Sequence, residues 1–85
     1  MADSRLFKIP LVLEPQPEGG YTVTSPTLPE LVTEGDTVEQ AMENVRDALA
    51  AVLEIYQEEG RALPAGIETD PGQAPIRFEY VFKAA

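Results

Sequence analysis

A helical spacing of apolar residues marks the middle of the chain. Apolar side chains recur every three or four positions over about five turns, at Val38, Ala41, Met42, Val45, Ala48, Leu49, Val52, Leu53 and Tyr56. This spacing predicts an amphipathic helix with one buried face. Its N-cap is expected at Thr37, with Gln40 completing a capping box, or one residue earlier at Asp36 with Glu39. Gly60 is placed to follow its last turn.

Alternation with a period of two predicts a strand over residues 5–13. One face carries Phe7, Ile9, Leu11 and Leu13. Leu6 and Val12 lie on the other face, which predicts that both faces are at least partly buried. Pro10 cannot donate a hydrogen bond to a neighbouring strand, so a bulge or an unpaired side is expected there.

Three further runs complete the predicted sheet. Residues 21–25 are expected to pair with the first strand as an antiparallel hairpin, and residues 31–34 form a third, short strand. After a loop over residues 60–75, residues 75–83 alternate strictly, with Ile76, Phe78, Tyr80 and Phe82 on one face. The order β-β-β-α-β predicts a single α+β domain over residues 1–85. It combines a three-stranded antiparallel meander with a fourth strand that follows one crossover helix. If that strand pairs parallel beside the first, the crossover should be right-handed.

One helix can cover only one face of this sheet. A chain of 85 residues buries only roughly 60–65% of the surface of its unfolded form, so a second copy over the open face would add stability. We therefore expect a homodimer or a tetramer. Its interface is expected to use the open sheet face and the last strand, with Ile76, Phe78, Tyr80 and Phe82.

Composition narrows the classes of function. The chain contains 15 Asp and Glu against 6 Lys and Arg, a net charge of -9, and it has neither His nor Cys. Ser4 and Ser25 have no recognisable base partner, so we expect no catalysis, no cofactor and no metal site. The negative charge argues against binding to nucleic acid or to an anionic membrane. Because no signal peptide and no membrane-length apolar run are found, a cytoplasmic protein is predicted.

Almost all of the excess negative charge lies in residues 30–59. This segment has one cation, Arg46, and nine acids: Glu30, Glu34, Asp36, Glu39, Glu43, Asp47, Glu54, Glu58 and Glu59. A solvated helix face and an acidic surface for a basic partner both explain such a segment. Its first four acids, near a strand end and a helix start, also raise the alternative of a magnesium site for phosphoryl chemistry.

Three short stretches together resemble the N-terminal domain of HicB-type antitoxins. They are Gly-Gly-Tyr-Thr-Val at 19–23, Pro-Thr-Leu-Pro at 26–29 and Thr-Glu-Gly-Asp-Thr-Val-Glu-Gln-Ala at 33–41. The helix over residues 44–56 and the stretch 60–64 fit the same pattern, so the resemblance covers about residues 6–82. It implies a partial RNase H-like fold. It also implies an antitoxin of a type II toxin–antitoxin pair, which covers the active surface of a small basic HicA-type toxin that cleaves mRNA.

Under this resemblance the expected toxin contacts are Glu30, Glu34, Asp36, Glu39 and Glu43. The family turn usually reads Pro-Asp-Leu-Pro-Gly, whereas this chain has Thr27 and Glu30. Many members carry a DNA-binding domain after this region. The residues after Gly60 leave no room for one, so direct DNA binding by this chain alone is not expected. Two alternatives stay open, namely a solitary, toxin-free HicB-like structural or regulatory oligomer and a metal-dependent nuclease.

Overall fold

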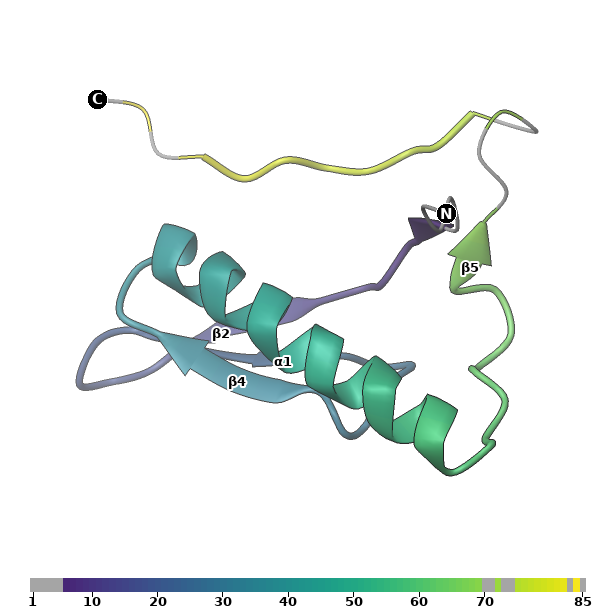
Figure 1. Ribbon diagram of the computed structural model, residues 1–85. Helices are drawn as coiled ribbons and strands as arrows, with labels where there is room; N and C mark the ends of the chain where they lie inside the picture. Colours follow the sequence, from purple (N-terminus) through teal and green to yellow (C-terminus); the bar gives the residue numbers. More distant parts are fainter. Residues whose placement is uncertain (1–5, 70–71, 73–74, 83, 85) are drawn as a thin grey trace.

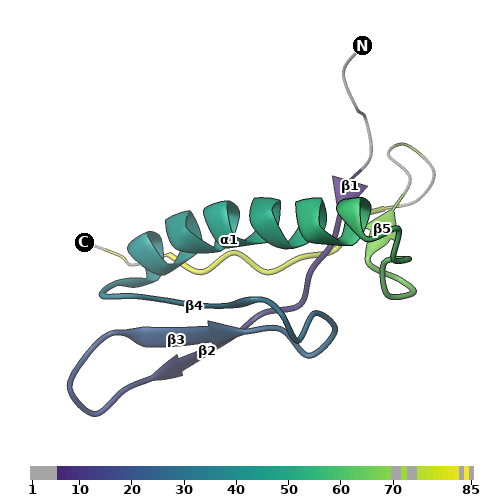
Figure 2. The same cartoon turned by 60° about the horizontal axis from the view of Figure 1, so that its bottom comes forward.

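The computed structural model describes residues 6–69, 72, 75–82 and 84 (Figure 1). Strands β2 (Val12–Pro15), β3 (Tyr21–Thr24) and β4 (Val32–Gly35) form an antiparallel meander in that order. Helix α1 (Val38–Glu58) lies across one face of this sheet, as Figure 2 shows from a second side. The predicted α+β class, hairpin and meander are therefore confirmed. The likeness to RNase H stays a prediction.

The start of α1 is held by the predicted cap. The Thr37 hydroxyl accepts a hydrogen bond from the Gln40 N–H at 3.1 Å, and Thr37 has extended backbone angles. The Gln40 side-chain oxygen accepts in turn from the Asp36 N–H at 2.6 Å. Thr37, rather than Asp36, is thus the N-cap, and its hydroxyl satisfies one N–H group of the first helical turn. The Gln40 side chain reaches back to the residue before the cap, one position earlier than in a strict capping box.

The end of α1 is equally well defined. Gly60 follows the C-cap with φ of +66°, and its N–H donates to the Gln57 carbonyl at 3.2 Å. The Arg61 N–H donates to the Tyr56 carbonyl at 2.9 Å. These two bonds form a Schellman motif, which needs a residue with positive φ at the position of Gly60.

The core lies between α1 and the meander, in two clusters. The first joins the helix, the turn between β3 and β4, and the chain after the helix; its buried members are Leu28, Leu31, Val52, Tyr56 and Ile67. The second joins β3 to the first half of the helix, through Val23, Ala41 and Val45. Ile67 lies in a stretch predicted to be a loop, yet it is only 2% exposed. Its burial anchors the chain after the helix to the domain.

The first predicted strand is wrong in its extent. It divides into β1 (Leu6–Phe7) and β2, with Pro10 in the irregular stretch between them. The lack of an N–H on proline explains the break. Leu6 and Val12 are 41% and 48% exposed, so the expected burial of both faces is also wrong. The reason is that α1 covers one sheet face only.

The predicted fourth strand is wrong as well. Residues 75–82 belong to no strand, and Lys83 lies outside the described residues. The neighbour of β1 is instead the two-residue β5 (Glu68–Thr69), which pairs with it antiparallel. Residues 75–82 run along the length of α1 without joining the sheet (Figures 1 and 2). Alternation describes the side chains of a strand, but a strand also needs a neighbour for its backbone groups.

Candidate functional site

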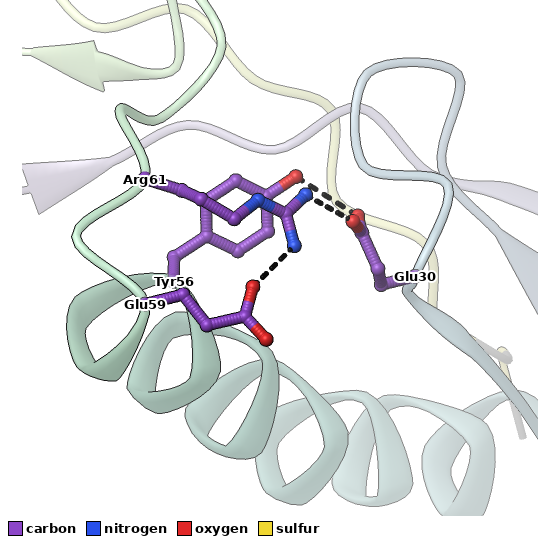
Figure 3. Close-up of polar contacts among 4 residues, drawn as sticks. All are labelled: Glu30, Tyr56, Glu59 and Arg61. Carbon is purple, nitrogen blue, oxygen red and sulfur yellow. Dashed lines mark hydrogen bonds and ion pairs between the residues drawn. The ribbon is translucent and has the colours of Figure 1, made fainter.

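The five acids predicted to contact a toxin do not form one cluster. Glu30 lies in the connection between β3 and β4, close to the C-terminal end of α1 (Figure 3). Glu34 lies on β4, while Asp36 and Glu39 flank the start of the helix. Glu43 follows Glu39 by four residues and therefore shares its face of α1. The fold thus separates Glu30 from the other four, of which Glu34 lies on β4 and the rest lie at or near the start of α1.

Glu34 belongs to the open face of the sheet. In the sheet register Thr22 pairs with Glu34 on one side and with Glu14 on the other. These three side chains therefore form one row on the face opposite the helix. Glu14 was not among the predicted contacts, because the sheet, rather than the sequence, brings it into line with Glu34. This face presents negative charge beyond residues 30–59.

The acids on β4 and near the start of α1 form no ion pair with any other residue that the structure describes. Among the residues that the structure describes, ion pairs are formed by Arg61 with Glu30 and Glu59 and not by Glu34, Asp36, Glu39 or Glu43. All four of these acids are exposed. Like charges four residues apart on a helix destabilise it slightly, by about 0.2–0.5 kcal/mol, unless a cation compensates them. The pair Glu39 and Glu43 would be relieved by a basic partner.

Glu30 is engaged within the molecule. Its Oε1 accepts a hydrogen bond from the Tyr56 hydroxyl at 2.9 Å, and its Oε2 accepts one from an Arg61 nitrogen at 2.6 Å (Figure 3). Arg61 also donates to Glu59 at 3.0 Å, and its guanidinium carbon lies 4.1 Å from the centre of the Tyr56 ring. The cluster ties the β3–β4 connection to the end of α1. Both carboxylate oxygens of Glu30 already have partners.

Titration behaviour follows from this cluster. Hydrogen bonding to Arg61, helped by the Tyr56 hydroxyl, holds the pKa of Glu30 below its usual value. Burial and the neighbouring Glu30 carboxylate raise the pKa of Tyr56. Hydrogen bonds to Glu30 and Glu59 raise the pKa of Arg61 further above its usual value. Near neutral pH the cluster therefore contains a carboxylate, a neutral phenol and a guanidinium.

No group of three or more acids within the described residues is arranged to hold a metal ion. Ser25, one of the two candidate nucleophiles, is 6% exposed. Its hydroxyl accepts hydrogen bonds from the Thr27 and Leu28 N–H groups at 3.4 and 3.3 Å. This pattern is that of a turn-stabilising serine. Ser4, the other candidate, lies outside the described residues.

None of the helices described is long and apolar enough to cross a membrane.

Comparison with known protein families supports the resemblance noted in the sequence. The sequence model of one family, described as HicB_like antitoxin of bacterial toxin-antitoxin system, matches residues 9–81. The chain belongs to the HicB-like antitoxin family. Within this family it is 42% identical over 75 residues to Antitoxin HicB 1 of Photorhabdus laumondii subsp. laumondii, which is 88% of this chain and 44% of that protein.

The chain is also similar to two further proteins named Antitoxin HicB. The chain is 42% identical over 58 residues to Antitoxin HicB of Escherichia coli strain K12, covering 68% of this chain and 42% of the relative. It is 32% identical over 66 residues to Antitoxin HicB of Pseudomonas fluorescens, covering 78% of this chain and 44% of the relative. The chain thus spans less than half the length of these HicB proteins.

Proposed function

We propose that this HicB-like chain is an antitoxin that neutralises a small basic toxin of the HicA type, which cleaves mRNA. It does so as a binding module without catalysis of its own, by covering the active surface of the toxin. The observation that carries the proposal is family membership over residues 9–81. Together with the relatives named Antitoxin HicB, it favours a toxin as partner.

Electrostatics supports this choice of partner. An RNA-cleaving protein needs a basic surface to bind phosphates. The present chain concentrates nine acids and one arginine in residues 30–59. Complementary charge speeds association and excludes wrong partners more than it adds affinity. The interaction is therefore expected to weaken as salt is added, since exposed charges are screened over about 8–10 Å at physiological ionic strength.

The proposed contacts are Glu34, Asp36, Glu39 and Glu43. They are exposed and form no ion pair within the described residues, so a basic partner can approach them without breaking an existing contact. We assign Glu30 a structural role, because Tyr56 and Arg61 occupy both of its carboxylate oxygens.

The chain is expected to act in the cytoplasm. The negative charge of residues 30–59 does not favour direct contact with DNA.

Co-expression tests the proposal. The chain is produced together with the toxin candidate, a small basic protein encoded in the neighbouring reading frame, and growth and complex formation are measured. We expect growth to be restored and the two proteins to purify together. Failure to bind or to restore growth with every such protein would contradict the proposed function.

Charge reversal tests the contact surface. The double variant Glu34→Lys with Asp36→Lys changes two of the proposed contacts, and a second double variant changes Glu39 and Glu43. The control reverses Glu18 and Glu68, two exposed acids outside residues 30–59, and changes the net charge equally. We expect weaker binding from the first two variants only. Equal effects of all three would show that net charge, and not this surface, governs binding.

A second candidate function is a toxin-free structural or regulatory oligomer. The observation that favours it is the exposed apolar row of residues 76–82, which a binding surface of acids does not explain. An absence of any toxin-like neighbouring reading frame, with stable self-association of the purified chain, would favour this candidate over the antitoxin.

A further inference from the structure

The face of the meander opposite α1 is open. Helix α1 and residues 75–82 lie on the same side of the sheet (Figures 1 and 2), so nothing that the structure describes covers the other side. Alternate residues of each strand point to this side. They are β-branched or acidic rather than uniformly polar, and apolar residues that lie side by side on a surface mark a site of contact with another protein.

Two rows of side chains cross the open face. In the sheet register Thr24 pairs with Val12 on one side and with Val32 on the other. The two valines are 48% and 60% exposed. The second row has a carboxylate at each end and consists of Glu14, Thr22 and Glu34. Protein interfaces have an apolar core and a polar rim, and the two rows supply one of each.

Charge identifies the occupant of the open face. Glu14 and Glu34 stand two strand spacings apart, about 9–10 Å, and neither forms an ion pair with a residue that the structure describes. No cation lies in either row. A second copy stacked on this face would enclose four carboxylates without a cation, which is unfavourable. A basic protein would supply a cation to each carboxylate and cover the valines at the same time.

A groove elsewhere on the molecule suits a basic partner less well. It lies between the first half of α1 and residues 77–81. Three cations and three acids line it, namely Lys8, Arg46 and Arg77 with Glu39, Glu43 and Glu79. The lining is therefore neutral although the chain carries -9. A basic protein would find little complementary charge there.

We propose, on the basis of the antitoxin function proposed above, that the open face of the meander docks on the basic, RNA-binding surface of the toxin. The two valines and Thr24 form the centre of the contact. Glu14 and Glu34 each meet a lysine or an arginine at its edge, where RNA phosphates would otherwise bind. Glu14 lies outside the acidic residues 30–59 and becomes a toxin contact through the sheet register alone.

The contact continues beyond the two rows. Three strands span only about 10 Å, whereas a standard interface buries about 800 Å² on each partner. Asp36 is exposed and follows Glu34 by two positions, so it extends the acidic edge past the end of β4. Glu39 and Glu43 lie on the helix layer, beside the cations of the groove. They are therefore expected to contribute less to binding than Glu34.

Matched charge reversals test the docking face. Glu14→Lys changes an acid on the face that lies outside residues 30–59, and the control Glu54→Lys changes an exposed acid of α1 that lies inside them. Both alter the net charge equally. Binding to the purified basic protein of the neighbouring reading frame is measured by calorimetry. We expect the dissociation constant to rise at least about tenfold for Glu14→Lys and less than about threefold for Glu54→Lys.

Labelling of a single cysteine tests the position of the contact, because the chain has no cysteine of its own. Thr24→Cys places a thiol at the centre of the face, and the control Ala51→Cys places one at an exposed position of α1. When the basic protein is added, alkylation of the Thr24→Cys variant by N-ethylmaleimide should slow at least about tenfold, since the core of an interface excludes solvent. Alkylation of the Ala51→Cys variant should not change.

Two results would overturn the docking face and leave the proposed function intact. One is a complex in which the Thr24→Cys variant keeps its free labelling rate. The other is a loss of affinity in Glu54→Lys that equals the loss in Glu14→Lys. Slow labelling without the basic protein that becomes fast on dilution would also overturn it, because a second copy would then cover the face. If no complex forms, the proposed function fails and the docking face fails with it.

Discussion

Gly35 brings strand β4 into close contact with the backbone of helix α1, and its replacement by alanine tests how the two layers pack. A Cβ atom on Gly35 would lie 2.4 Å from the Ala41 nitrogen and 2.6 Å from the Ala41 Cα. Both are backbone atoms, so no side chain can rotate away. Ordinary contacts of a Cβ begin near 3.4 Å, which means that strand and helix must separate by about 1 Å.

The cost of this separation can be worked out from the core beneath it. Ala41 and Val45 pack on Val23 in one buried cluster. A gap of about 0.5–1 Å removes a quarter to a half of the dispersion energy of each atom pair. Overpacking typically costs about 1–3 kcal/mol, and a backbone clash belongs at the upper end. We expect Gly35→Ala to lower the free energy of unfolding by about 3 kcal/mol, out of a total of roughly 4–13 kcal/mol for a chain of this length.

The assay is urea unfolding followed by the helical circular dichroism signal, with Gly60→Ala for comparison. Gly60 has positive φ, but an added Cβ would meet no atom within 4 Å. Its replacement should cost about 1–2 kcal/mol, for the left-handed conformation alone. If Gly35→Ala is no more destabilising than Gly60→Ala, the close approach of β4 and α1 is not what the structure describes.

Three further predictions concern stability. Thr37→Ala should lower the free energy of unfolding by about 1 kcal/mol, because it removes the helix cap, and Thr37→Ser should restore most of the loss in thermal unfolding. Ile67→Ala should cost about 2–5 kcal/mol in urea unfolding, whereas Val32→Ala, at a position 60% exposed, should cost under about 0.5 kcal/mol. The pKa of Glu30 is lower in the folded chain than its usual 4.5, so its contribution to stability is complete above pH 4.5 and is lost as the pH falls through the folded value. Glu30→Gln should therefore flatten the acid limb of stability measured against pH, and an unchanged limb would contradict the role of the Arg61 contact.

The helix and the meander could be predicted because their signals are local. The spacing of apolar residues, the Thr37 cap and Gly60 all act within a few positions of one another. Pro10 was recognised as an obstacle, although its full effect, a division into two strands, depends on which backbone groups find partners. Strand pairing over long distances has no such local signal. The pairing of β1 with the short β5 therefore escaped prediction.

The candidate site could likewise be predicted only in part, because some of its contacts join residues that are distant in sequence. Nine acids in one segment predict an acidic surface, but not which acids are free. Glu30 and Arg61 are 31 positions apart in sequence and meet only because the β3–β4 connection folds against the end of α1. Glu14 joins Glu34 through the register of the sheet.

Inhibition of a purified toxin tests the central claim, that this chain neutralises an RNA-cleaving protein through its acidic surface. Cleavage of RNA by the neighbouring basic protein is measured while the chain is added, at low and at high salt. Cleavage should stop at stoichiometric amounts of the chain. Inhibition should weaken as salt is added and after reversal of Glu34 and Asp36. Undiminished cleavage at saturating chain would contradict it.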